Sequence, residues 1–131
     1  MATVLLLRHG RTTANATGEL AGRLPVELDD TGRGQAQRVG ERLRKLPLAA
    51  VVTSPLIRCR QTLELALPDI VPEVDEGLIE CGYGDWEGRP LKELTGEPLW
   101  PVGNRSNWTT PGVPRPGPSA SDWRTCRWPP W

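Results

Sequence analysis

The residues most able to do chemistry lie where an apolar run ends near the start of the chain. Residues 4–7 are Val-Leu-Leu-Leu, and Arg8, His9 and Gly10 follow directly, with Asn15 just beyond. In open parallel sheets ligands bind outside the carboxyl ends of strands, a glycine lets the backbone approach a ligand, and N–H groups that open a helix favour anions. His9 is the single histidine of the sequence. A lone Arg-His-Gly tripeptide is a weak signal, since such a histidine is more often structural.

Three further patterns strengthen that signal because they follow in order downstream. With the first, they read Arg8-His9-Gly10-x-Thr12-x-x-Asn15, Leu28-Asp29-x-x-Gly32-x-x-Gln35-Ala36, Ser54-x-Leu56-x-Arg58-x-x-x-Thr62 and Leu78-x-Glu80-x-x-x-Gly84-x-Trp86-Glu87-Gly88. Together they resemble the histidine phosphatase superfamily, in its phosphoglycerate-mutase-like branch, over residues 3–100. Any one pattern alone would be weak, whereas four in order are specific.

The resemblance implies a phosphomonoester phosphatase that acts through a phosphohistidine. His9 would attack phosphorus as a neutral imidazole. Arg8 and Arg58 would hold the phosphate oxygens, since a guanidinium binds them bidentately and keeps its charge. Glu80 would protonate the leaving alcohol. Asn15 and Arg23 would line the phosphate site.

Each of these residues also has an ordinary structural interpretation when it is taken alone. An arginine on a helix, as Arg58 is predicted to be, is normally solvated or ion-paired, and a glutamate in a glycine-rich loop, such as Glu80, is normally solvated. Arg11, Arg23 and Arg60 are weaker candidates still, and Cys81 is expected to be a packed thiol because no helper base is visible. Only the joint match favours the catalytic interpretation of His9, Arg8 and Arg58.

One departure from the family pattern bears directly on activity. The family has a second histidine, usually followed by glycine, late in the chain, where it completes the positive clamp around the phosphoryl group. This sequence contains no second histidine. Loss of one clamp residue commonly slows such a reaction ~10²–10³-fold, so we expect weak activity. Two alternatives stay open: a non-catalytic remnant that binds a phosphate ligand, and a non-functional product of a shifted reading frame.

The elements that must position these residues can be read from hydrophobic pattern and turn signals. Strands are predicted at Thr3–Leu7, buried on both faces, at Leu48–Thr53 and at Ile70–Val74, where Pro72 marks an edge or an interruption. Helices are predicted from about Leu28 to Lys45, from a Ser54 N-cap and Pro55 through Leu63, and over Pro90–Leu94. Residues 78–88 form a glycine-rich loop.

This alternation predicts an α/β fold with βαβ units and a parallel sheet. By resemblance the architecture would be a three-layer sandwich with a mostly parallel sheet, incomplete at its C-terminal end. Residues 1–100 are assigned to a partial histidine phosphatase domain. Residues 101–131 hold seven Pro, three Gly and four of the six Trp, a composition typical of disordered sequence or of coding sequence read in the wrong frame.

Composition restricts the partners and the compartment. Residues 1–100 carry a net charge of −3 and residues 101–131 one of +3, so no dense basic region indicates a nucleic-acid partner. Three cysteines without C-x-x-C spacing indicate neither a disulfide framework nor a zinc site. No signal peptide or membrane span is expected, which makes the cytoplasm the default. The resemblance implies a small phosphorylated metabolite as partner, with no metal or cofactor, and leaves the oligomeric state open.

Overall fold

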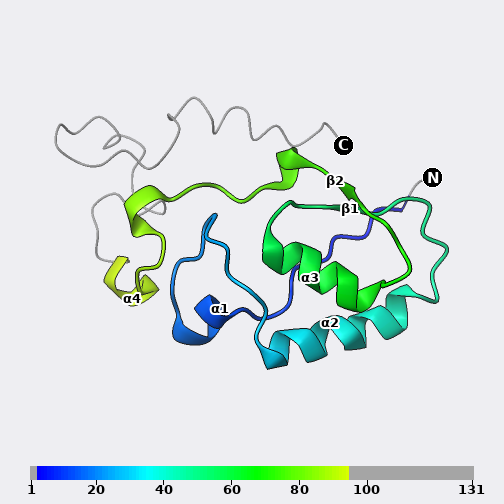
Figure 1. The fold of residues 1–131 in the computed structure, drawn as a ribbon, viewed down its shortest axis with the longest axis horizontal. Coiled ribbons are helices and arrows are strands. Elements are labelled where there is room, and N and C mark those ends of the chain that lie inside the picture. Colours follow the sequence, from blue (N-terminus) through cyan, green and yellow to red (C-terminus); the bar gives the residue numbers. More distant parts are fainter. Residues whose placement is uncertain (1–2, 95–131) are drawn as a thin grey trace.

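The computed structural model describes residues 3–94, and the assignment of residues 101–131 to a separate tail lies outside them. One part of the described chain is a βαβ unit (Figure 1). Strand β1 (Val52–Thr53) is followed by helix α3 (Ile57–Ala66) and strand β2 (Glu73–Val74), and the two strands pair in parallel with Val52 opposite Glu73. The predicted parallel pairing and its crossover helix are confirmed, over fewer residues than the hydrophobic runs indicate.

Helix α2 (Asp30–Leu43) lies alongside α3 and forms the main core with it. The Asp29 side chain caps α2 by accepting from the Gly32 N–H at 2.7 Å. Leu63 and Ala66 of α3 are buried together with Leu67, which follows the helix. Five partly buried side chains pack against them: Val39, Leu43, Leu48, Val51 and Ile70. Gly40 lets the helices approach closely, because a Cβ there would collide with the Ala66 carbonyl. The helix predicted from about Leu28 to Lys45 is therefore confirmed, with bounds shifted by about two residues.

Short elements complete the described chain. Helix α1 (Thr13–Thr17) follows the Arg8-His9-Gly10 turn, two 3₁₀ turns cover Glu76–Leu78 and Gly84–Trp86, and α4 (Leu91–Leu94) ends the described part. The glycine-rich loop is held against residues 18–20 by backbone bonds, in which the Gly88 N–H donates to Leu20 O at 2.8 Å and the Leu20 N–H donates to Arg89 O at 2.9 Å.

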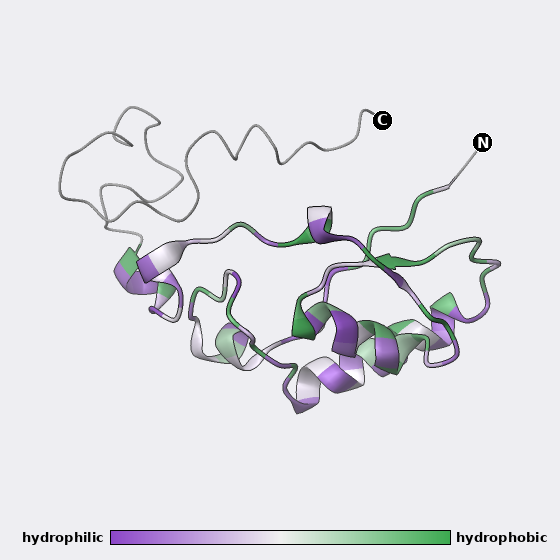
Figure 2. Ribbon diagram, turned by 45° about the horizontal axis from the view of Figure 1, so that its top comes forward, coloured by the Kyte–Doolittle hydropathy of each residue, from purple (hydrophilic) through white to green (hydrophobic). Residues whose placement is uncertain are grey.

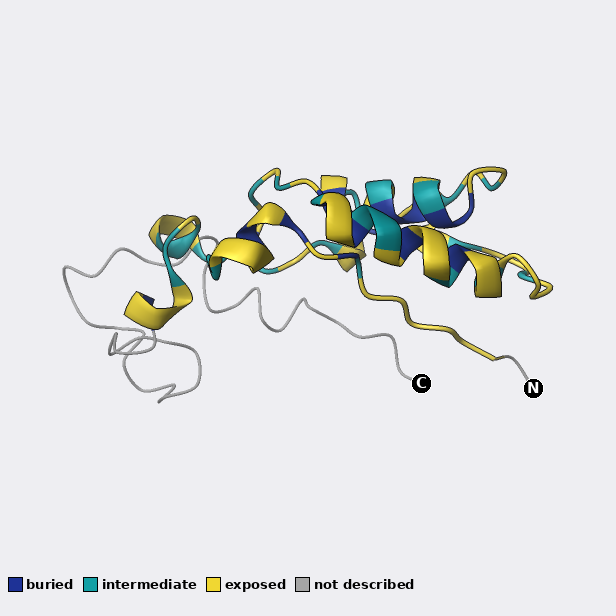
Figure 3. Ribbon diagram, turned by 90° about the horizontal axis from the view of Figure 1, so that it is seen from below, coloured by how far each residue is buried: buried dark blue, intermediate teal, exposed yellow. Residues whose placement is uncertain are grey.

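The strand predicted at Thr3–Leu7 is wrong. This segment is extended but unpaired within the described residues, and it is exposed, with Leu6 at 80% and Leu5 at 53%. Figures 2 and 3 show the apolar stretch running away from the helices and exposed along its whole length. A strand needs backbone partners on a neighbouring strand, and β1 and β2 form the one sheet found in residues 3–94.

The start of α3 also differs from the prediction. Leu56, in extended conformation, is the N-cap residue and the helix begins at Ile57. Ser54 instead accepts a hydrogen bond from the Leu56 N–H at 3.4 Å. The Ser-Pro pair therefore makes the bend before the helix, because the Ser54 hydroxyl accepts from the N–H of Leu56, the N-cap residue, and not from an N–H of the first helical turn.

Candidate active site

His9 lies at the end of the extended N-terminal segment and is half-buried. Its Nδ1 atom lies 2.7 Å from the Gly10 carbonyl oxygen. Because a carbonyl oxygen only accepts hydrogen bonds, the Nδ1 atom carries the proton. In the neutral ring the free lone pair is then on Nε2, which is the state a nucleophilic imidazole requires.

The surroundings of His9 favour the neutral ring. Burial lowers the pKa of His9 below 6.5 as the largest cause, while the Gly10 carbonyl raises it. The positive charges of Arg58 and Arg8 lower this pKa further, and the Glu80 carboxylate raises it. All three predicted charged partners therefore act on the imidazole, although they come from separate stretches of sequence.

The backbone beside His9 is fixed by helices α2 and α3. The Gly10 N–H donates to the Thr62 hydroxyl at 3.0 Å, and that buried hydroxyl donates to the Arg58 carbonyl at 2.7 Å. On its other side, Gly10 packs so closely on the Gly32 carbonyl that a Cβ would overlap it. Glycine is required at this position for space.

Arg58 is buried, with 4% of its surface exposed. Its guanidinium donates to the carbonyl of Gly22 at 2.8 Å and to that of Leu24 at 3.5 Å. A guanidinium has five N–H donors, so these two bonds orient the group and leave further donors for an anion. The turn at residues 22–24 is thus the support of the arginine predicted to hold phosphate.

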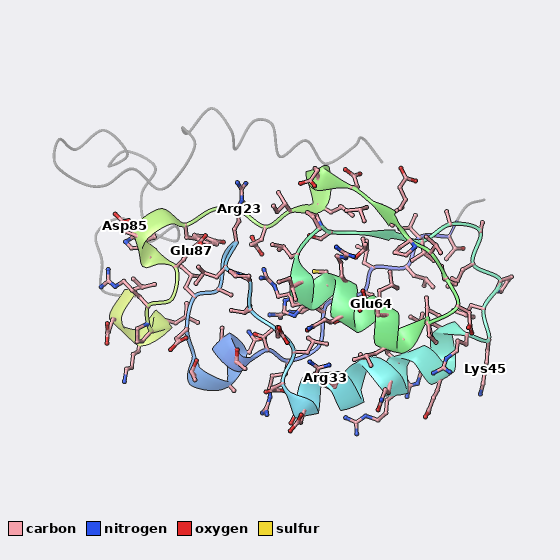
Figure 4. All side chains as sticks on the ribbon, in the orientation of Figure 1. Arg23, Arg33, Lys45, Glu64, Asp85 and Glu87 are labelled. Carbon is pink, nitrogen blue, oxygen red and sulfur yellow. The ribbon has the colours of Figure 1, made fainter. Side chains whose placement is uncertain are left out.

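Glu80 and Arg23 meet at the loop that follows β2. The Glu80 carboxylate is exposed and accepts from the Cys81 N–H at 2.9 Å. Arg23 donates from Nε to the Glu80 main-chain carbonyl at 2.8 Å, and Figure 4 shows its side chain extending from the 22–24 turn toward this loop. The contact seen for Arg23 therefore holds the loop of the predicted acid.

Asn15 has a structural role in the local fold. Its Oδ1 accepts from the Thr12 N–H at 3.1 Å, while the Thr12 hydroxyl accepts from the Asn15 N–H at 3.1 Å, which forms the capping box of α1. This arrangement fixes the direction of the chain just after His9. The Asn15 carboxamide oxygen is used in the cap, which leaves its NH₂ group as the donor for the predicted contact with phosphate.

Two side chains of the site received no role from the sequence. Thr62 joins the His9–Gly10 turn to α3, as described above. Glu87 accepts from the backbone N–H groups of Arg23 at 3.0 Å and Tyr83 at 2.9 Å. Both residues belong to the patterns that define the resemblance, but a side chain that accepts from a distant backbone N–H is revealed only by the tertiary structure.

No group of three or more His, Cys, Asp or Glu side chains within residues 3–94 is arranged to hold a metal ion. None of the helices in this part of the chain is long and apolar enough to cross a membrane.

Comparisons with known proteins agree with these patterns. The sequence pattern of the histidine phosphatase superfamily (branch 1) matches residues 4–125. The adenosylcobalamin/alpha-ribazole phosphatase of Salmonella typhimurium is 39% identical over 94 residues, which cover 70% of this chain and 46% of that protein. The chain spans about half the length of the curated relatives it matches.

Solved structures show the same relationship. The alpha-ribazole phosphatase of Shigella flexneri matches with a TM-score of 0.64 and 34% identity, covering 71% of this chain and 47% of that one. The phosphoserine phosphatase of Entamoeba histolytica, solved with 3-phosphoglyceric acid, matches with a TM-score of 0.62 and 31% identity, covering 68% and 45%.

Proposed function

We propose that this chain, which belongs to the histidine phosphatase superfamily (branch 1), transfers the phosphoryl group of a small phosphomonoester to His9 and then to water. The observation that carries the proposal is the state of His9. Its Nδ1–H donates to the Gly10 carbonyl, so that Nε2 is free, and Arg8, Arg58 and Glu80 all act on the ring electrostatically.

In the proposed reaction the Nε2 lone pair forms a bond to phosphorus as the bond from phosphorus to the ester oxygen breaks. Arg8 and Arg58 bind the phosphoryl oxygens, whose charge must be neutralised for the transfer. Glu80 gives its proton to the departing alkoxide, which leaves as an alcohol. Water then attacks the phosphohistidine, with the Glu80 carboxylate accepting a proton, and inorganic phosphate and free His9 result.

The proposed substrate class is a small phosphorylated metabolite. Support comes from the relatives, which are named as phosphatases of alpha-ribazole and of phosphoserine. Hydrolysis is preferred to transfer onto a second substrate, because the residues Gly84 to Gly88 resemble the phosphatase-type members of the family. The cytoplasm stays a prediction from the sequence.

A second candidate function is phosphate binding without turnover. The observation that favours it is the single histidine of the sequence, since the family pattern places a second one in the positive clamp. Arg8, Arg58 and a neutral His9 would still form a site for a phosphate dianion. The two functions differ in whether a phosphorus–oxygen bond breaks.

Hydrolysis of p-nitrophenyl phosphate and of phenyl phosphate by the full chain tests the proposal. His9→Ala should abolish release of inorganic phosphate from both substrates. Glu80→Gln should slow the phenyl ester by about 10²-fold, because phenolate needs the acid, and the nitrophenyl ester less. Glu76→Gln, four residues earlier on the same exposed segment, is the matched control and should not change either rate.

The outcomes separate the two candidates. Turnover that persists at an unchanged rate in His9→Ala would refute the phosphohistidine route. Saturable binding of inorganic phosphate by a wild-type chain that releases no phosphate would instead establish the binding function.

A further inference from the structure

Glu87 joins two loops that are far apart in sequence. Its Oε1 atom accepts from the Arg23 N–H at 3.0 Å and from the Tyr83 N–H at 2.9 Å. The carboxylate also packs directly against Gly22, where a Cβ would collide with the same oxygen. Figure 4 shows Glu87 facing the turn that carries Arg23, whereas Asp85 lies on the outer side of its own turn.

Both loops hold groups that belong to the candidate active site. The first loop provides the carbonyls of Gly22 and Leu24 that receive the Arg58 guanidinium. It also provides the Arg23 side chain, whose Nε donates to the main-chain carbonyl of Glu80 at 2.8 Å. The Oε1 atom of Glu87 therefore bonds to the loop that contacts both the Arg58 guanidinium and the Glu80 backbone.

We propose that Glu87 is a positioning residue that sets the Arg58 guanidinium and the Glu80 loop for phosphoryl transfer. The inference rests on the proposed function of the site. A carboxylate that accepts two N–H groups makes charge-assisted bonds, which are stronger and shorter than neutral ones. Those bonds fix the turn at residues 22–24, so the carbonyls that receive Arg58 are held in place before phosphate arrives.

Other contacts keep the loops together without Glu87. The backbone bonds between Gly88 and Leu20 and between Leu20 and Arg89 lie to one side of the 22–24 turn, and the Leu91 N–H donates to Gly18 O at 2.8 Å. A substitution at Glu87 therefore removes the fixation of the turn but leaves the loop pairing. We expect such variants to fold.

Titration of the full chain with inorganic phosphate tests the inference, followed by the NMR signals of the His9 imidazole. His9 is the single histidine of the chain, so its signals need no assignment, and the measurement does not depend on turnover. Glu87→Ala should weaken phosphate binding about tenfold, which is the size expected for two lost charged hydrogen bonds that act indirectly. Glu87→Gln keeps an acceptor oxygen and should restore affinity to within about threefold of wild type.

Asp85→Ala is the matched control, because Asp85 is an exposed carboxylate two residues earlier and should leave phosphate affinity unchanged. Wild-type affinity in Glu87→Ala would overturn the inference. So would a Glu87→Gln variant as weak as Glu87→Ala, because an acceptor oxygen at this position would then contribute nothing to phosphate affinity.

Rates on two esters supply a readout that a general loss of stability would not move. If Glu87 also sets Glu80, Glu87→Ala should lower kcat more for phenyl phosphate than for p-nitrophenyl phosphate, and equal losses would contradict this part. A wild-type chain that binds phosphate but hydrolyses neither ester would refute the phosphatase proposal, while the affinity series would still decide the role of Glu87. A wild-type chain that binds no phosphate would overturn the inference.

Discussion

The two sides of the Arg8-His9-Gly10 turn differ sharply in how the chain holds them. On the C-terminal side, Gly10 is bonded to Thr62 and packed on Gly32, and the chain continues into the capped helix α1. On the N-terminal side, residues 4–7 are apolar, extended and exposed, with Leu6 at 80%. His9 stands at the boundary between a packed region and an unpacked one.

This difference separates two kinds of structural requirement. On the C-terminal side, the hydrogen-bonding and packing partners of the chain come from helices and turns within residues 10–62. On the N-terminal side, residues 4–7 could form a strand only by pairing with a neighbouring strand. In residues 3–94, β1 and β2 pair with each other and not with this segment. The candidate site is thus positioned from the helical side of the histidine.

The largest difference in unfolding free energy should come from a Leu→Ala substitution made on each side of the turn. Leu63→Ala removes a side chain buried in the α2–α3 core and should lower the free energy of unfolding by about 3 kcal/mol. Leu6→Ala should change it by less than about 0.5 kcal/mol, as for other exposed positions. Urea unfolding of both variants provides the measurement. Equal losses would show that residues 4–7 are packed in solution, and would contradict the difference between the two sides of the turn.

A second pair of variants tests the close packing on the C-terminal side of the Arg8-His9-Gly10 turn. Gly32→Ala places a Cβ into the Arg11 backbone and should cost about 2 kcal/mol, the usual scale for overpacking. Gly34→Ala lies in the same helix with nothing within 4 Å of its Cβ and should stabilise by roughly 0.5–1 kcal/mol, since alanine is the better helix former. Thermal unfolding distinguishes the two, and a tolerated Gly32→Ala would refute the close approach.

Thr62 supplies a smaller test at the boundary itself. Thr62→Val leaves the Gly10 N–H without its partner and should destabilise the chain by about 1–2 kcal/mol. Thr62→Ser keeps the hydroxyl and should recover most of the hydrogen-bonding loss, so the two unfolding free energies should differ. If Val and Ser variants unfold alike, the hydrogen bond from Gly10 contributes nothing measurable.

The smallest effect concerns pH. The pKa of His9 is lowered in the folded chain, chiefly by burial, so below its ordinary value near 6.5 the unfolded chain binds a proton that the folded chain resists. Stability should therefore fall as pH drops from above 6.5 toward the folded pKa and this contribution should level off below it. The unfolding free energy of wild type minus that of His9→Ala, measured across this range, isolates the effect. A difference that grows as pH falls would reverse the sign.

Helices α2 and α3 were predictable because their signals are local, whereas the short helix α1 was not predicted. Asp29 begins α2 and the apolar positions of that helix face α3, while Pro47 and Pro68 limit how far α2 and α3 extend. The failure at Thr3–Leu7 has the opposite cause, since an apolar run indicates a strand without indicating its partner. The start of α3 was missed because Ser54 has a hydrogen-bond partner just outside the helix.

The candidate site also has features that local sequence patterns predict and features that depend on tertiary contacts. Four patterns predicted that His9, Arg8, Arg58 and Glu80 act together, which stays a prediction; the charges of Arg58, Arg8 and Glu80 each contribute to the pKa shift of His9. The connections that hold the group were not predictable. Arg23 donates to the Glu80 backbone, Asn15 caps α1 and Glu87 fixes the 22–24 turn, and each contact depends on segments that meet only in three dimensions.

The proposed role of His9 as nucleophile can be tested by trapping the phosphoryl group on its ring. The full chain is mixed with p-nitrophenyl phosphate, quenched in base, in which phosphohistidine survives, and examined by ³¹P NMR. Because the sequence holds one histidine, any phosphohistidine signal belongs to His9. We expect such a signal, on Nε2, and expect it to be absent in His9→Ala. Release of inorganic phosphate without any phosphohistidine, at the same rate in both proteins, would contradict it.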